Sequence, residues 1–299
     1  MTTTADVNAE PRYRSARVGK VDVFYREAGP PDAPVLLALH GFPSSSHMYR
    51  ALLNGLGHRW RVIAPDYPGF GQSSMPAMND FTYSFAAYAD VIEQFSAAIG
   101  LTRYALYVQD YGGPIGFRLA ARHPDRVNGL IIQNANAYEE GFGPLFDPIR
   151  SLWERRDEER EAAVLALFKL DITRFQYLEG ATNPSHISPD TWSLDQYYMD
   201  RPGNDRIQLE LQYDYRNNPP EYVRWQQYFR EHEPPTLIVW GRNDPFFKVA
   251  GAQAYLHDLP RAELHFFDGG HFVLEEHARR IVPLIDAFLE RTTTVTVAP

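Results

Sequence analysis

Apolar positions in this chain gather into short unbroken runs, and helix-period stretches separate most of these runs. An apolar run without alternation is typical of a strand that is buried on both faces of a sheet. Between the runs, apolar side chains recur every three or four residues, as at 82–99, which predicts covering helices. The predicted strands are 35–40, 60–65, 104–109, 127–133, 236–240 and 263–267, preceded by an antiparallel hairpin at 13–18 and 21–26. We therefore expect an α/β fold whose mostly parallel, eight-stranded sheet carries helices on both faces.

The alternation of strands and helices stops between about 138 and 233. Helical stretches without a buried strand occupy this segment, at 148–153, 160–170, 193–199, 206–215 and 221–230. We interpret 138–233 as a helical cap inserted into one catalytic core, which comprises 11–137 and 234–291. The ends of the chain, 1–10 and 292–299, are expected to be flexible tails.

Composition narrows the classes of function. The net charge of −9 argues against a basic face for nucleic acid or for an anionic membrane. The chain has no cysteine, which excludes disulfides and thiolate chemistry. Its N-terminus is polar, unlike a signal peptide, and no apolar run reaches membrane-spanning length. We therefore expect a soluble cytoplasmic protein, and the sequence contains no motif for a metal, nucleotide or flavin cofactor.

A sharp turn follows the predicted strand at 104–109. Asp110 stands at this turn, and the glycines Gly112 and Gly113 follow closely. Small residues are needed where a strand passes at once into a helix, and this layout is typical of a nucleophile elbow. A carboxylate presented there can attack carbon and form an ester without a base to deprotonate it. The alternative is an ordinary aspartate at a helix N-cap.

Three other predicted strand ends carry reactive side chains, namely His40, Asp244 and His271. Ligands of open parallel sheets bind beyond the carboxyl ends of the strands. The chain order Asp110, Asp244, His271 is that of a nucleophile, acid and histidine triad. In this interpretation, His271 activates the water that hydrolyses the ester, and Asp244 holds its imidazole ring in orientation.

The backbone N–H groups of Phe42 and Tyr111 complete the expected site as an oxyanion hole.

Each reactive side chain also has a plainer interpretation. His271 can be a loop histidine, Asp244 a turn residue and His40 a cap for local backbone groups. Their joint order at successive strand ends favours the triad.

Several segments resemble one family. V-Q-D-Y-G-G at 108–113 is similar to the V-Q-D-W-G-G and H-D-W-G-G elbows of α/β-hydrolases with aspartate nucleophiles, the haloalkane dehalogenases and epoxide hydrolases. The segments H-G-F-P at 40–43, D-Y-P-G-F-G-Q-S at 66–73 and G-H-F at 270–272 match the same superfamily. The resemblance spans roughly 13–289, with the cap matching least well, and implies the α/β-hydrolase fold and the covalent mechanism.

The resemblance separates the two branches by how the leaving group is stabilised. Haloalkane dehalogenases hold halide with N–H donors, from the tryptophan after the nucleophile and from a cap tryptophan or the asparagine of H-G-N-P. Tyr111 and Phe42 stand at these positions here, which counts against halide release. Epoxide hydrolases share H-G-F-P and use cap tyrosines as acids. Y-D-Y-R-N at 213–217 resembles their cap segment and implies Tyr215 as one acid, with Tyr177 the best match for the other.

Tyr197, Tyr198 and Tyr213 are alternatives to Tyr177, and ordinary packing is an alternative for every cap tyrosine because the chain has 18 tyrosines. The related fluoroacetate dehalogenases bind carboxylate with an arginine after the nucleophile, where this chain has Tyr111.

The sequence thus predicts a cofactor-independent hydrolase that acts on a small neutral organic substrate with water. Epoxide hydrolysis to a diol ranks first, and haloalkane or haloacid dehalogenation ranks second. Hydrolysis of a lactone or activated acyl compound is a further alternative, as is a non-catalytic ligand-binding protein on the same scaffold. Neither nucleic acid nor membrane is expected as a partner, and the oligomeric state is left open.

Overall fold

The computed structural model describes residues 10–294 and contains an eight-stranded sheet. In sheet order the strands are β1 (Arg12–Val18), β2 (Val21–Ala28), β4 (Arg61–Pro65), β3 (Val35–Leu39), β5 (Tyr104–Gln109), β6 (Val127–Gln133), β7 (Thr236–Gly241) and β8 (Glu263–Phe267). β1 pairs antiparallel with β2 and β2 with β4, and the remaining neighbours are parallel. The predicted sheet is therefore confirmed.

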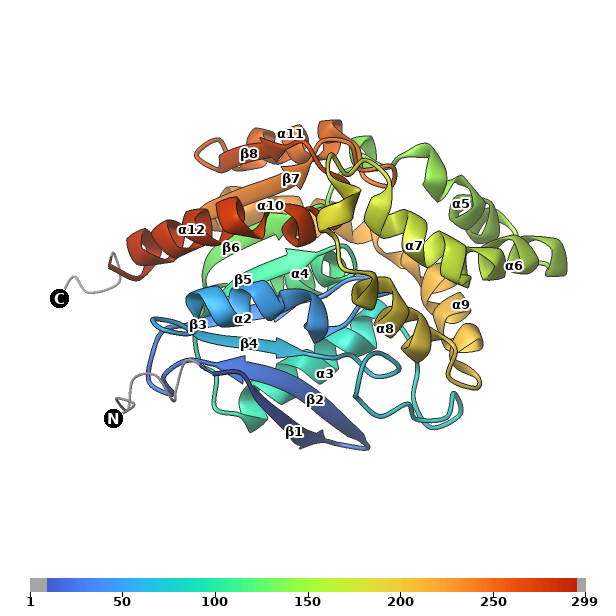
Figure 1. Cartoon of the computed structure of the whole chain (residues 1–299), viewed down its shortest axis with the longest axis horizontal. Helices are drawn as coiled ribbons and strands as arrows, with labels where there is room; N and C mark the ends of the chain where they lie inside the picture. The colour runs from blue at the N-terminus through green and yellow to red at the C-terminus, as the bar shows by residue number, and fades with distance from the viewer. Residues whose placement is uncertain (1–9, 295–299) are drawn as a thin grey trace.

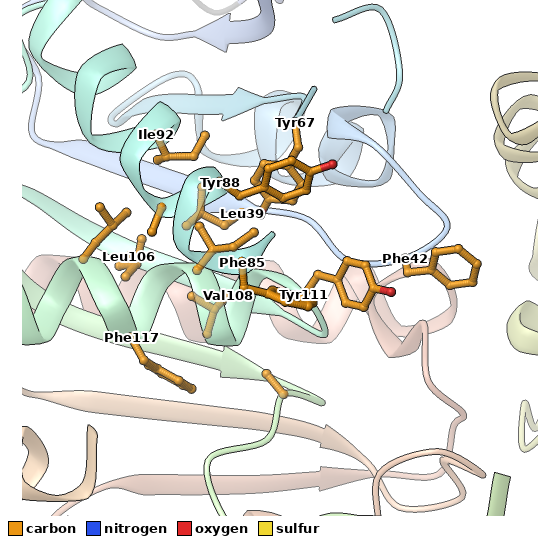
Figure 2. Packing of buried hydrophobic residues seen from close by; sticks show 14 of the residues in the cluster. Leu39, Phe42, Tyr67, Phe85, Tyr88, Ile92, Leu106, Val108, Tyr111 and Phe117 are labelled. Atoms are coloured by element: carbon orange, nitrogen blue, oxygen red, sulfur yellow. The ribbon is translucent and has the colours of Figure 1, made fainter. Parts of the chain in front are cut away.

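The two faces of the sheet bury separate hydrophobic clusters. Along β3, Leu37 and Leu39 belong to one cluster, and Leu36 and Ala38 belong to the other, because successive side chains point to opposite faces. The first cluster packs against α3 (Phe85–Ala98), α4 (Gly112–Arg122) and α11 (Val249–Asp258), and Figure 2 shows part of it. The second packs against α2 (Arg50–Leu56) and α12 (Val273–Thr294). This two-sided burial explains the unbroken apolar runs of the central strands.

A helical segment leaves the sheet between β6 and β7. Its helices are α5 (Asp147–Glu154), α6 (Glu158–Leu165), α7 (Leu170–Leu178), α8 (Pro189–Met199), α9 (Asn204–Asp214) and α10 (Tyr222–His232). Figure 1 shows α5 to α9 gathered beyond one end of the sheet, as expected for a cap. α10 instead packs against α4 and α11 of the core. The domain boundary at 233 stays a prediction.

Three details differ from the expected elements. The helix predicted at 160–170 ends at Leu165, and α7 begins after Lys169, whose φ of −90° and ψ of 154° are extended. The sequence predicts a last helix from about 276 to 290, but α12 begins at Val273 and bends at His277. It also continues to Thr294, into the segment predicted as a flexible tail. The rest of the two predicted tails, 1–9 and 295–299, lies outside the described residues.

No helix within 10–294 is long and apolar enough to cross a membrane.

Candidate active site

β5 passes into α4 through Asp110, whose φ of 48° lies in the left-handed region. Such strain persists where the surrounding structure enforces it. Two glycines allow the necessary close approach. A Cβ on Gly112 would lie 2.0 Å from the carbonyl oxygen of Leu39, and one on Gly41 would lie 2.3 Å from the Cβ of Asp110. The turn therefore presents the Asp110 carboxyl group beyond the end of β5, as a nucleophile elbow does.

Two backbone N–H groups hold this carboxyl group. The N–H of Phe42 donates to Oδ1 of Asp110 at 2.7 Å, and the N–H of Tyr111 also bonds to the carboxylate. Burial raises the pKa of Asp110, while the His271 ring and the two N–H groups counteract part of that rise. The structure thus brings the expected oxyanion donors to the expected nucleophile.

His271 stands beside Asp110 on the loop before α12. Its Nε2 lies 3.9 Å from Oδ2 of Asp110, and its Nδ1 lies 2.8 Å from Oδ2 of Asp244. Because the Asp244 carboxylate accepts a hydrogen bond at Nδ1, Nε2 of the neutral ring carries the lone pair that a base needs. Burial lowers the pKa of His271, but the charge and hydrogen bond of Asp244, together with the Asp110 charge, outweigh it and raise the pKa overall.

Two further side chains belong to this site and were missed by sequence reasoning. Asn134 follows β6 directly, with a φ of 39°, and its Nδ2 donates to Oδ2 of Asp244 at 2.7 Å. Gln109, the last residue of β5, places its Nε2 2.8 Å from Nε2 of His271. Both are polar residues at a carboxyl strand end, which is the signal that could have identified them.

His40 is fully buried and does not line the cavity beside Asp110. Its Nδ1 bonds to the Gly41 carbonyl oxygen at 3.0 Å, and its Nε2 accepts the N–H of Tyr67 at 3.3 Å. Burial lowers its pKa to about 3, so the ring is neutral. His40 therefore supports the backbone of the loop that carries Phe42, in line with its plainer interpretation as a backbone cap.

A small cavity lies between the elbow and the cap, with a volume of about 40 Å³ open to the centre of a water molecule. Most of its lining is apolar. The lining residues are Phe42, Asp110, Tyr111, Phe146, Ile149, Leu167, Ile172, Gln176, Gln212, Phe246 and His271. Such an enclosure suits a small uncharged molecule.

Tyr111 brings a phenol to this cavity. Its ring packs against Phe42 with centroids 5.8 Å apart, and Figure 2 shows its oxygen on the side of Phe42. The hydroxyl is buried and has no hydrogen-bond partner among the described residues. Burial, with the nearby Asp110, raises the pKa of Tyr111 well above its ordinary value, so the hydroxyl stays protonated and can donate.

The two expected cap acids do not line the cavity. The hydroxyl of Tyr177 donates to Oδ2 of Asp195, and its ring stacks on Phe272 at 4.0 Å. Tyr215 stacks on Trp153 with ring centroids 5.7 Å apart, and its ring also lies 6.1 Å from that of Tyr111. Catalytic roles for Tyr177 and Tyr215 therefore stay predictions.

The alternative cap tyrosines also lie elsewhere. Tyr197 is exposed, Tyr198 accepts a hydrogen bond from Gln72, and Tyr213 lies beneath the guanidinium of Arg216. None of the three lines the cavity.

A larger hollow of about 470 Å³ lies at the opposite, amino edge of the central strands. Its Arg261 and Arg291 are already paired with Glu233 and Glu263. It lies away from Asp110 and His271, so we assign the chemistry to the smaller cavity.

Comparisons with known proteins agree with this geometry. The family model described as alpha/beta hydrolase fold matches residues 34–278. An uncharacterized hydrolase of Saccharomyces cerevisiae is 37% identical over 90% of this chain and 94% of its own length. A cis-3-alkyl-4-alkyloxetan-2-one decarboxylase of Xanthomonas campestris is 28% identical, covering 94% of this chain and 96% of that protein. A haloalkane dehalogenase of Psychrobacter cryohalolentis is 26% identical, covering 95% and 93%.

A solved structure is similar along nearly the whole chain. The crystal structure of DBJA superposes with a TM-score of 0.78 at 26% identity, covering 95% of this chain and 98% of that one.

Proposed function

We propose that this chain, which belongs to the alpha/beta hydrolase fold family, cleaves small uncharged electrophiles through a covalent ester on Asp110. One observation carries the proposal. The Asp110 carboxylate faces a small, mostly apolar cavity, with two N–H donors on one side and a histidine oriented by an aspartate on the other. We place epoxides first among the substrates.

The first step is ring opening. Oδ2 of Asp110 attacks an epoxide carbon, a C–O ester bond forms, and the ring C–O bond breaks with its electrons on the departing oxygen. That oxygen then needs a proton. Tyr111 supports this step because its protonated, unpartnered hydroxyl lies in the cavity lining beside the nucleophile.

The second step is hydrolysis of the ester. Nε2 of His271 takes a proton from water, and the hydroxide attacks the ester carbonyl carbon of Asp110. The N–H groups of Phe42 and Tyr111 stabilise the tetrahedral oxyanion. When the intermediate collapses, the alkoxide leaves with the proton from the imidazolium. This leaves Asp110 as a carboxylic acid, and loss of its proton restores the Tyr111 hydroxyl, so the products are a diol and the free Asp110 carboxylate.

Release of a halide is the second candidate, and the likeness to a haloalkane dehalogenase favours it. In that reaction the carbon–halogen bond breaks with its electrons on the halide, which needs hydrogen-bond donors and no proton. The same ester and the same hydrolysis would follow.

The intact mass of the His271→Gln variant, incubated with a panel of small epoxides, haloalkanes and lactones, tests the proposal. Without its base the enzyme should accumulate the ester. Addition of a whole epoxide supports the first candidate, and addition of an alkyl group without its halogen supports the second. The matched control is His271→Gln combined with Asp110→Asn, which must show no adduct. If no compound gives an adduct that depends on Asp110, the proposed function is wrong.

A further inference from the structure

Two glutamine side chains of the cap reach the cavity and find no hydrogen-bond partner within 10–294. Gln176 on α7 and Gln212 on α9 are each 4% exposed, and both line the cavity. Oε1 of Gln212 is buried and unpartnered, and the described residues offer the Gln176 amide no hydrogen bond. Burying an amide without a partner is unfavourable. Because no hydrogen bond within 10–294 fixes either amide, each can turn about its last side-chain bond and present its N–H group to a bound acceptor.

Helical geometry explains why Gln176 faces the cavity while the neighbouring tyrosine does not. Ile172 and Gln176 are one turn apart on α7, and both line the cavity. Tyr177 points about 100° further round the helix, where its hydroxyl binds Asp195. One residue of difference therefore separates a side chain that lines the cavity from one that joins α7 to α8.

The nucleophile and the two amides come from different parts of the fold. Asp110 lies at the carboxyl end of the central strand β5, whereas Gln176 and Gln212 lie on the cap helices above it. In a displacement at carbon, the leaving atom departs on the side opposite the nucleophile. A substrate attacked by Asp110 therefore directs its leaving atom towards the cap. The other cap residues in the lining, Phe146, Ile149, Leu167 and Ile172, are apolar.

We infer that the side-chain amides of Gln176 and Gln212 bind the leaving atom, an epoxide oxygen or a halide, as its bond to carbon breaks. This inference rests on the aspartyl-ester function proposed above. Amide N–H groups stabilise negative charge without giving up a proton, so they serve either leaving atom. Tyr111 is the group that can protonate an epoxide oxygen. The amide pair thus lowers the barrier to ester formation for both leaving atoms. The Tyr111 proton is needed only when the leaving atom is an epoxide oxygen.

The rate of ester formation tests this role. In the His271→Gln background, Gln176→Met and Gln212→Met keep side-chain length and remove the donors. Each should slow adduct formation roughly 10- to 100-fold, the range for a hydrogen bond to a charged group. The loss should be larger for a chloroalkane than for the matching iodoalkane, because chloride needs more stabilisation. A change that merely disturbs packing would slow both equally.

Gln208→Met is the matched control, because Gln208 is buried one turn before Gln212 and does not line the cavity. It should leave the rate of adduct formation within about threefold. Gln176→Leu and Gln212→Leu replace any methionine variant that fails to fold by circular dichroism. If the parent forms the ester and the glutamine variants form it equally fast, the inference is overturned while the proposed function stands. If the parent forms no ester, both are overturned.

Discussion

Asn134 donates its side-chain amide to the same Asp244 oxygen that accepts the hydrogen bond at Nδ1 of His271. The other Asp244 oxygen accepts the N–H of Phe246 at 2.7 Å, and Oδ1 of Asn134 accepts the N–H of Gly241 at 3.0 Å. Asn134 therefore ties the ends of β6 and β7 together and fixes the carboxylate that orients the base. We regard it as a positioning residue.

Two replacements of Asn134 distinguish the loss of its side-chain amide from the strain of its left-handed backbone. Asn134→Gly tolerates the φ of 39° and removes the amide, so turnover should fall about tenfold and the free energy of unfolding by about 1–3 kcal/mol. Asn134→Ala adds the strain and should be the less stable of the two. Steady-state kinetics and urea unfolding measure both quantities. Unchanged kinetics in the glycine variant would show that Asp244 needs no help from this amide.

The pH dependence of turnover should follow His271. Its pKa is raised by Asp244 and Asp110 against the effect of burial, and the ring acts as a base only when neutral. Turnover should therefore rise with pH through a value above the ordinary histidine pKa of about 6.5. Asp244→Asn removes the main raising influence, so this limb should move to lower pH. Turnover should also fall by on the order of 10²–10⁴ because the ring loses its orientation.

Tyr111→Phe tests which phenol protonates an epoxide oxygen. The change removes the hydroxyl and keeps the ring contacts with Phe42 and Phe85. Epoxide opening should slow by about 10²-fold or more, and release of a halide should slow less, because halide needs no proton. Tyr215→Phe is the matched comparison. If Tyr215→Phe slows ring opening and Tyr111→Phe does not, the acid is the cap tyrosine that the family resemblance implies.

Asp195 should make stability depend on pH. It is buried beside the Tyr177 hydroxyl, with Arg50 and Glu275 nearby, and burial raises its pKa to about 7. An unfolded aspartate has a pKa near 3.9, so from about pH 4 to 7 the folded protein binds more protons than the unfolded chain. This group should therefore lower the free energy of unfolding as pH rises through that window, by at most about 1.4 kcal/mol per pH unit.

Urea unfolding at about pH 5 and pH 8 measures this slope. Asp195→Asn should reduce it, and Asp190→Asn, an exposed change on the same helix, should leave it unchanged. Equal slopes in the wild type and the Asp195 variant would show that this carboxyl group titrates normally.

Gly100, in the loop between α3 and β5, and Gly112 of the elbow should tolerate substitution according to space rather than φ alone. A Cβ on Gly100 meets nothing within 4 Å, although its φ is 75°, so Gly100→Ala should lower the free energy of unfolding by about 1–2 kcal/mol. A Cβ on Gly112 would strike the Leu39 carbonyl at 2.0 Å, so Gly112→Ala should cost roughly 3 kcal/mol or more and abolish ester formation. Thermal unfolding compares the two variants, and equal losses would contradict the close approach.

Much of the fold and of the triad could be read from the chain because both depend on local patterns. Runs such as 35–39 and 104–109 are apolar throughout, since the strands are covered on both faces. Residues that follow such strands must meet at one edge when the strands are parallel. Asp110, Asp244 and His271 could therefore be grouped before any distance was known.

The cap could not be resolved in the same way. Its helices form wherever helix propensity allows, but which side of each helix meets the cavity depends on how it packs on the core. A shift of one residue turns a side chain by about 100°, which is the difference between Gln176 and Tyr177. The sequence by itself thus determined the sheet, the elbow and the order of the triad. The tertiary structure alone decided which cap side chains face the nucleophile, because that choice follows from helix rotation rather than from composition or spacing.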